Sequence, residues 1–165
     1  MTAADAPAGD PETRARTALE ASGVGFTVTR HGAVASLEEA AAARGLDPDH
    51  VLKTIVVRRG EDDFLFVLVP GGRQISWPRL RHLLGVSRLS LPDKDVAREV
   101  TGYERGTITP FGALRAWPVV ADSRVAGSGL VSIGAGAHGV AASLDADDLL
   151  RALDATSADV TDPGR

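Results

Sequence analysis

The spacing of hydrophobic residues along this 165-residue chain changes between the period of a helix and that of a strand. Segments with a helical cap, a stop residue or helical spacing predict five helices, over residues 11–22, 37–44, 78–84, 93–101 and 146–153. Short runs rich in β-branched and aromatic residues predict strands, over residues 24–30, 51–59, 63–69, 118–122, 130–133 and 139–144. Because strands and helices do not alternate strictly, the pattern predicts an α+β fold in which a mixed sheet packs against helices.

Cap residues define the ends of several predicted helices. Ser36 and Glu39 have the S-x-x-E spacing of a capping box, and Gly45 is a typical helix stop directly after the predicted helix. Pro78 suits the first turn of a helix, and Asp145 is an N-cap residue for the last helix. These signals predict that the elements are well delimited and separated by short connections.

The length and the composition indicate one globular domain. Residues 1–10 are small and polar and are expected to form a disordered tail, whereas residues 11–160 are expected to form a single domain. Apolar residues make up 44% of the chain and charged residues 24%, and there is no cysteine. The absence of cysteine excludes disulfides, thiolate metal sites, iron–sulfur clusters and a cysteine nucleophile. No secretory signal or apolar run of membrane-spanning length is found, so we expect a soluble cytoplasmic protein.

The charge is unevenly distributed. Residues 51–120 carry 11 basic and 7 acidic side chains, whereas the rest of the chain carries 7 basic and 15 acidic ones. A basic middle between acidic ends suits a polyanionic ligand on one face, although a solvated surface with a chance fluctuation gives the same pattern.

The segment "LVSIGAGAHGVAASL" contains G-x-G-x-x-G at Gly134, Gly136 and Gly139. A dinucleotide-binding loop needs this spacing between a strand and a helix. Here the glycines are followed by an alternating run that predicts a second strand, and the chain after Gly139 is too short for the rest of such a fold. The glycines are therefore expected to form a turn between two strands, which brings backbone amides close to any ligand there.

Two other features are candidates for chemistry. Lys53 in "VLKTIVV" shares a strand face with Val51, Ile55 and Val57. If that face is covered, the ammonium needs an anion such as a phosphate or a developing oxyanion; if Lys53 lies near the strand start, its side chain reaches water instead. The segment "TGYERGTITPFG" forms a loop rich in glycine and proline after a helix, and it serves either as a ligand-binding loop or as a plain connection.

Other catalytic motifs are absent from the sequence. No G-x-S-x-G, H-E-x-x-H or G-x-x-x-x-G-K-[ST] occurs, and the four histidines form no ligand pair at helical spacing. The sequence therefore offers no recognisable metal site, although ligands that converge in space remain open.

Taken together, the motifs resemble the YbaK/ProX-type aminoacyl-tRNA deacylases and the editing insertion of bacterial prolyl-tRNA synthetases. The resemblance lies in the order and spacing of "SLEEAAAARGL", "VLKTIVV", "TGYERGTITPFG", "VVADS" and "SIGAGAHGV", and it spans roughly residues 20–155. It implies a single editing domain with a curved, partly barrel-like mixed sheet and flanking helices. It also implies cleavage of an aminoacyl ester on tRNA, of hydrolase or lyase type, without a metal or a cofactor.

The resemblance assigns roles to particular residues. Lys53 matches the functional lysine of the family and is the expected catalytic residue. The expected substrate-binding residues lie in the glycine–proline loop, at the end of the next strand and in the last turn: Gly102, Tyr103, Gly106, Thr109, Pro110, Asp122 and Gly136. Asp122 binds the substrate ammonium or orders a water in this interpretation, and it forms only a strand-end Asx turn in the alternative one.

The resemblance also implies a substrate and partners. The expected substrate is a mischarged tRNA, first Cys-tRNA(Pro) and next the alanine or serine form, with weak direct tRNA binding through the basic middle and prolyl-tRNA synthetase as a candidate partner. Membranes and DNA are not expected partners. Thr107 and Thr109 stand where the family commonly has glycine and serine. Thr107 is the main feature that favours the alternative, a non-catalytic binding module of the same fold that holds an aminoacyl-nucleotide-like ligand or a protein partner. The hypothesis of a nucleotide-dependent oxidoreductase rests on the segment GAGAHG alone.

Overall fold

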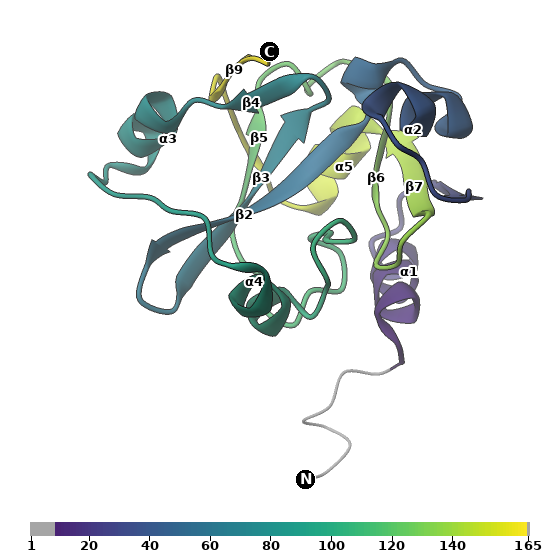
Figure 1. Cartoon of the computed structure of the whole chain (residues 1–165), viewed down its shortest axis with the longest axis horizontal. Coiled ribbons are helices and arrows are strands. Elements are labelled where there is room, and N and C mark those ends of the chain that lie inside the picture. Colours follow the sequence, from purple (N-terminus) through teal and green to yellow (C-terminus); the bar gives the residue numbers. More distant parts are fainter. Residues whose placement is uncertain (1–8, 165) are drawn as a thin grey trace, which may run out of the picture.

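The computed structural model describes residues 9–164, which form five α-helices and nine strands (Figure 1). The helices are α1 (Pro11–Ala21), α2 (Leu37–Arg44), α3 (Trp77–Leu84), α4 (Lys94–Thr101) and α5 (Ala146–Ala152), with a short 3-10 helix η2 (Pro48–His50). The strands are β1 (Thr27–Arg30), β2 (Leu52–Gly60), β3 (Asp63–Pro70), β4 (Arg73–Ile75), β5 (Val119–Asp122), β6 (Leu130–Gly134), β7 (Val140–Asp145), β8 (Thr156–Ala158) and β9 (Thr161–Pro163). The tail expected to be disordered lies largely outside the described residues.

The predicted caps are confirmed by backbone geometry. The Ser36 hydroxyl accepts a hydrogen bond from the Glu39 amide, and the Asp145 carboxylate accepts one from the Asp148 amide. Gly45 and Gly85 end α2 and α3 with positive φ, which a glycine adopts without the steric cost that a Cβ atom adds. The helix boundaries therefore follow local chemistry and match the sequence prediction within one or two residues.

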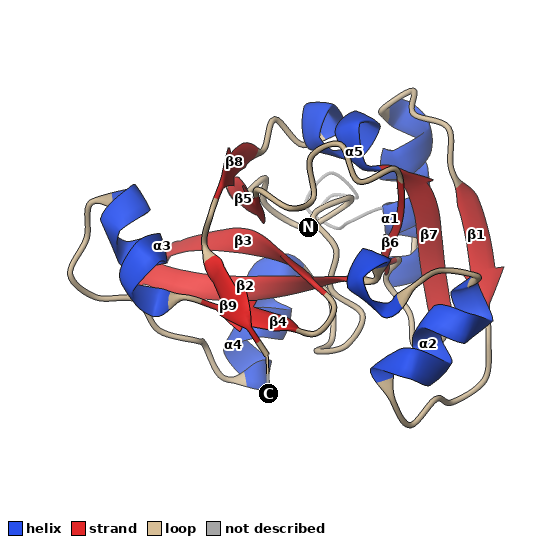
Figure 2. Cartoon of the chain, turned by 90° about the horizontal axis from the view of Figure 1, so that it is seen from above, coloured by secondary structure: helices blue, strands red, loops and turns tan. Residues whose placement is uncertain are grey.

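The strands form three sheets. The largest is mixed and has the order β2-β3-β5-β8, in which β2 and β3 are antiparallel and the other neighbours are parallel. The second has the order β1-β7-β6, and the third pairs β4 with β9. A bridge between Val51 and Ser132 connects the start of β2 to β6, so the first two sheets follow one another around a curve that does not close (Figure 2). This arrangement is the expected α+β fold with a partly barrel-like mixed sheet.

Both faces of the largest sheet are covered. One face packs against the second sheet, α1 and α5, and the other packs against α3 and residues of β4 and of the chain before β9. β3 is buried along almost its whole length, as expected for a central strand covered on both faces. The two strand faces therefore lead to two different parts of the molecule, and this separation decides where each candidate residue lies.

The glycines of GAGAHG form the turn between β6 and β7, which pair in antiparallel register. No helix follows this turn, because β7 continues directly from it. The prediction of a turn between two strands is confirmed, and the dinucleotide-binding interpretation is without structural support.

Candidate active site

Lys53 lies near the start of β2, opposite Val69 of β3. Its stem follows the sheet face that also carries Ile55 and Val57, as the alternation predicts, but the residue is exposed and its Nζ reaches the sheet edge. There it donates a hydrogen bond of 2.9 Å to the Arg73 carbonyl. No carboxylate contacts this ammonium within residues 9–164, so it keeps donors for an incoming acceptor.

The ammonium is partly removed from water, and this desolvation lowers the pKa of Lys53. A lysine in this state is poorly solvated without being neutralised by a partner. Such a group gains more than an ordinary surface lysine from contact with a phosphate or a developing negative charge.

A hollow of about 310 Å³ opens beside Lys53. Its walls are Lys53, Ile55, Gln74, Ile75, Trp77 and Leu91, which come from β2, β4, α3 and the loop before α4. Apolar walls with one ammonium and one amide are typical of a small-ligand site, in which the polar groups fix the orientation. The volume is at the low end of such sites and suits a small group better than a large one.

Asp122 ends β5 and lies beside Val69, because its neighbour Ala121 pairs with Leu68. It therefore shares a sheet face with Lys53, one strand removed. The side chain is fully buried, and its oxygens accept hydrogen bonds from the Thr161 hydroxyl at 2.9 Å and from the Val160 amide at 3.2 Å. The Arg124 amide donates to the same carboxylate at 3.1 Å, which is the geometry of an Asx turn.

The protonation of Asp122 reflects two opposing effects. Burial by itself raises the pKa of the carboxyl, but the hydrogen bonds from Arg124, Thr161 and Val160 outweigh it, so the pKa of Asp122 is lowered. The carboxylate is therefore ionised, and its oxygens already accept hydrogen bonds from neighbouring residues. These contacts favour the Asx-turn interpretation over direct contact with a substrate ammonium.

The glycine–proline loop, residues 102–112, has a shape held by buried side chains. Tyr103 is fully buried and its hydroxyl donates to the Phe111 carbonyl at 2.7 Å, while the Thr109 hydroxyl accepts from the Phe111 amide. Burial raises the pKa of Tyr103 to about 12, so this hydroxyl stays protonated. Tyr103 and Thr109 thus hold the shape of the loop from inside the protein. Both side chains are fully buried, so neither offers a surface for the predicted contact with substrate.

A second cavity of about 550 Å³ lies where the loop meets the β6–β7 turn and α1. Gly102, Thr107, Gly136 and His138 line it, together with residues of α1 and α4. Gly136 has φ of +90°, and a Cβ atom there would lie 2.5 Å from the Pro11 carbonyl oxygen. Glycine is therefore needed at Gly136 because α1 packs directly on the turn.

The predicted site residues thus fall into two groups. Lys53 and Asp122 share the face that β4, β9 and α3 cover, whereas Gly102 and Gly136 line the cavity beside α1. Gly106 does not line it, but a Cβ atom built there would lie 3.5 Å from the ring of His138, which does. No loop residue lines the hollow at Lys53, and Lys53 does not line the second cavity. Joint action of Lys53 and the loop amides on one carbonyl remains a prediction without a contact to support it, and the same holds for a substrate contact of Pro110.

The family departure at Thr107 has a local explanation. Its side chain is almost fully buried, and its hydroxyl donates to the Glu104 carbonyl at 2.7 Å. The extra side chain is therefore turned into its own loop. His138 is an exposed turn residue whose Nε2 lies 3.4 Å from a Glu104 carboxylate oxygen.

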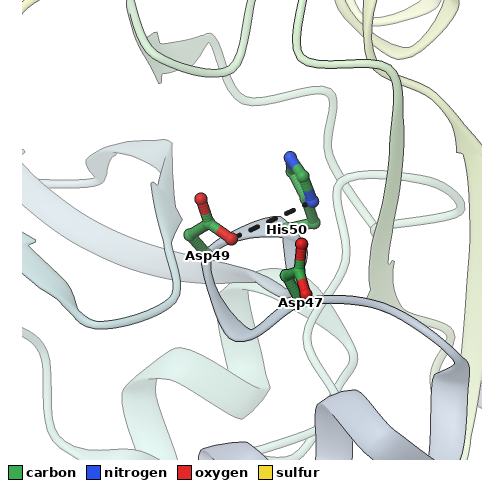
Figure 3. A group of neighbouring side chains, drawn as sticks. All are labelled: Asp47, Asp49 and His50. Atoms are coloured by element: carbon green, nitrogen blue, oxygen red, sulfur yellow. Dashed lines mark ion pairs between the residues drawn. The ribbon is translucent and has the colours of Figure 1, made fainter.

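Asp47, Asp49 and His50 cluster on and beside η2, a grouping that the sequence search for paired histidines missed (Figure 3). Their ligand atoms lie within 4.8 Å of one another, and His50 Nδ1 is 3.9 Å from Asp49 Oδ1. Both carboxylates are exposed, and exposed acidic groups of this kind are common without a metal. The cluster alone therefore does not define a metal site.

Sequence reasoning missed the elements that complete the hollow. The sequence prediction places no strand between residue 69 and the helix at 78–84, but Arg73–Ile75 forms β4 and supplies Gln74 and Ile75 to the walls. Its partner β9 was not predicted either. The only sequence signal was Ile75 between polar neighbours, which is too short a pattern to predict a strand. No helix among the described residues is long and apolar enough to cross a membrane.

The fold and the hollow define a class: a single-domain α+β protein with a small apolar-walled hollow beside a lysine. Residues 31–152 match the family model of the aminoacyl-tRNA editing domain, and the chain belongs to this family. This confirms the resemblance to the YbaK-type domain and to the editing insertion of prolyl-tRNA synthetases.

Individual relatives agree with the family. The proline–tRNA ligase of Syntrophotalea carbinolica is 34% identical over 116 residues, which are 68% of this chain and 20% of the ligase. That of Lactobacillus gasseri is 35% identical over 75 residues, 46% of this chain and 13% of the ligase. The chain thus spans about a fifth or less of these two relatives. A crystal structure of a protein described as a proposed trans-editing enzyme for prolyl-tRNA synthetase aligns with a TM-score of 0.85 and 26% identity, covering 93% of this chain and 98% of that one.

Proposed function

We propose that this chain is a trans-editing deacylase that removes a mischarged small amino acid from tRNA(Pro), with cysteine as the first candidate and alanine or serine next. The observation that carries the proposal is the Lys53 ammonium beside a small apolar-walled hollow in a chain of the editing family. The names of the ligase relatives and of the structural neighbour support proline as the tRNA specificity. Such an enzyme would work in the cytoplasm, where aminoacyl-tRNAs are made and used.

The chemistry requires little from the protein. The scissile bond is an ester, which is already labile, so no nucleophilic side chain is needed. In the proposed role, Lys53 holds the terminal phosphate or stabilises the negative charge that develops on the carbonyl oxygen. The attacking group is a water, a ribose hydroxyl or the side chain of the substrate itself.

A small hollow gives the selectivity that a synthetase lacks. One methylene is worth only about 1–3 kcal/mol of discrimination in binding, so a synthetase cannot reject a smaller amino acid by affinity alone. A second site that admits only small side chains can hydrolyse the wrong amino acid after the synthetase has attached it to the tRNA. Ile55, Ile75 and Trp77 would set this size limit, since they form the apolar walls.

The proposal is tested by a deacylation panel. We expect the purified protein to deacylate tRNA(Pro) charged with cysteine, alanine or serine well above the spontaneous rate and to spare Pro-tRNA(Pro). The readout is the loss of radiolabelled amino acid from each tRNA. Loss of none of the four above background would contradict the proposed substrate and would favour the alternative of a non-catalytic binding module.

We further propose that the tRNA backbone contacts a groove of about 420 Å³ at the tip of the β2–β3 hairpin. Arg58, Arg59 and Arg88 line it. Other arginines of the basic middle are engaged elsewhere: Arg73 donates to Thr161 and Arg79 pairs with Asp162. Within the groove, Arg59 is itself paired with Asp63 at 3.0 Å, so Arg58 and Arg88 are the arginines proposed to contact phosphate.

The groove and the hollow both lie along β2, the edge strand of the largest sheet. β2 contributes to both, and the loop before α4 supplies Ser90 to the groove and Leu91 to the hollow. Lys53 and Arg58 are five residues apart on the strand, which is about 17 Å at the usual rise. Because the two residues are an odd number apart, their side chains leave opposite faces of β2, so an RNA end that contacts both would follow the edge of the sheet.

Salt dependence tests the groove. We expect Arg58→Ala and Arg88→Ala each to raise KM for the charged tRNA several-fold at low salt and to reduce the slope of log KM against log salt by about one, because each phosphate contact releases counterions. Arg16→Ala, an exposed arginine on α1, is the matched control and should leave the slope unchanged. A wild-type KM that does not respond to salt would contradict the groove proposal.

A further inference from the structure

The carbonyl that binds Lys53 belongs to the short strand β4. The same strand supplies Gln74 and Ile75 to the hollow, and its only partner strand among the described residues is β9, which follows α5 and β8 near the end of the described chain (Figure 1). The β4–β9 register pairs Ile75 with Thr161 and Arg73 with Pro163. β9 therefore holds the wall of the hollow, although it lies beyond the family match at residues 31–152.

Thr161 is the residue of β9 that connects this wall to the centre of the fold. It is fully buried. Its hydroxyl donates to Asp122 Oδ1 at 2.9 Å and accepts from Arg73 Nε at 2.7 Å. Arg73 Nη2 also donates to the Thr161 carbonyl at 3.1 Å. Thr161 thus joins a buried carboxylate on β5 to the arginine whose own carbonyl binds Lys53.

Hydrogen bonds thus run from Asp122 through the Thr161 hydroxyl to the Arg73 side chain, and the backbone carbonyl of the same Arg73 accepts from Lys53. The inner part is held by more than one contact, because Asp122 also accepts from Val160 and Arg124, and Arg73 also donates to the Thr161 carbonyl. The charged groups on the surrounding elements are Arg73 on β4, Arg79 on α3, Asp122 on β5 and Asp162 on β9, and none of them bonds directly to the Lys53 ammonium within residues 9–164. Only the backbone of β4 therefore orients it.

We propose that Thr161 is a positioning residue, which fixes the β4 carbonyl that orients Lys53 and so completes the site with a strand from outside the matched family domain. The expected effect on kcat rests on the deacylase function proposed above. The effect of Thr161 on the environment of Lys53 can be tested without it. In this view the matched family domain alone is incomplete, since the last strand supplies the support for the lysine.

The experiment uses the full chain and the fact that it contains only two lysines, Lys53 and Lys94. With 13C-labelled lysine, the two side-chain NMR signals can be assigned with Lys94→Arg, and the pKa of Lys53 can be followed directly. In Thr161→Val, β4 loses its support and Lys53 becomes more solvated. We expect its pKa to rise from its lowered value toward 10.5, and kcat for deacylation to fall at least tenfold, with KM for tRNA within twofold.

Two variants make the test specific. Thr161→Ser keeps the hydroxyl and should restore both the Lys53 pKa and kcat to near the wild-type values. Thr156→Val makes the same chemical change at an exposed position on β8 and should alter neither. If Thr161→Val does not fold, Arg73→Gln removes the Nε donor of the same bond and is expected to give the same two changes.

The outcomes separate the two proposals. A folded Thr161→Val with an unchanged Lys53 pKa and an unchanged kcat would overturn the positioning role. A wild-type protein without deacylase activity would contradict the proposed function, whereas a Lys53 pKa that responds to Thr161→Val and recovers in Thr161→Ser would still support the positioning role.

Discussion

Lys53→Ala is expected to lower kcat/KM for deacylation of mischarged tRNA(Pro) by about 100-fold or more, the usual effect of removing a group that stabilises developing charge. The reason is the position of the ammonium, which is partly desolvated, placed at the rim of the hollow and, within residues 9–164, bound only to a backbone carbonyl. The measurement is the single-turnover rate on the preferred substrate of the panel. Circular dichroism should show an unchanged fold, because Lys53 is exposed and contributes little to the core.

Lys94→Ala is the matched control, since it removes the other lysine from the exposed start of α4. It should keep the wild-type rate. The pH profile gives an independent check. If the charged form of Lys53 is needed, the rate corrected for spontaneous hydrolysis declines as pH rises through the Lys53 pKa, with a midpoint below 10.5 because desolvation lowers that pKa. If Lys53→Ala kept the wild-type rate, Lys53 would not be the catalytic residue, and the cavity beside the glycine–proline loop would be the next candidate for the active site.

The elements that the sequence predicted well are those with local signals. Ser36 and Asp145 cap helices through their own side chains, and Gly45 and Gly85 end helices through their own backbone conformation. The hairpin of β2 and β3 follows from two long β-branched runs joined by a short turn. In each case the physical cause lies within a few residues, so a single sequence contains it.

The parts that were missed depend on distant partners. β4 and β9 are three residues each and exist because they pair with one another across the fold. The bond between Asp122 and Thr161 connects positions 39 residues apart. Likewise, alternation predicted which face of β2 carries Lys53, but it could not predict that the glycine loop would pack at the other side of the sheet, where Phe111 joins the core. A resemblance gives the order of motifs and does not give their distances.

Asp122→Ala is expected to lower the free energy of unfolding by about 3 kcal/mol, the usual cost of breaking a buried charged group away from its partners. The substitution leaves the Val160 amide and the Thr161 hydroxyl without their acceptor in a region that water does not reach. Urea unfolding at pH 7 measures the difference, and the melting temperature should fall by roughly 10 °C for a domain of this size. The deacylase rate of the folded fraction should also fall, because Thr161 loses its anchor.

Asp159→Ala is the matched control. Asp159 pairs with the same Arg124 at 3.0 Å, but it is about half exposed, and such pairs contribute about 1 kcal/mol or less. The pH dependence has a definite sign. The folded-state pKa of Asp122 is lowered below 3.8, so its stabilising contribution is fully present above the unfolded pKa and is lost as pH falls through the folded one. The difference in stability between wild type and Asp122→Ala should therefore be constant from pH 7 to about 5 and shrink below pH 4. If Asp122→Ala were as stable as Asp159→Ala at pH 7, the buried network would not hold the last strand in place, and the support proposed for Lys53 would lose its origin.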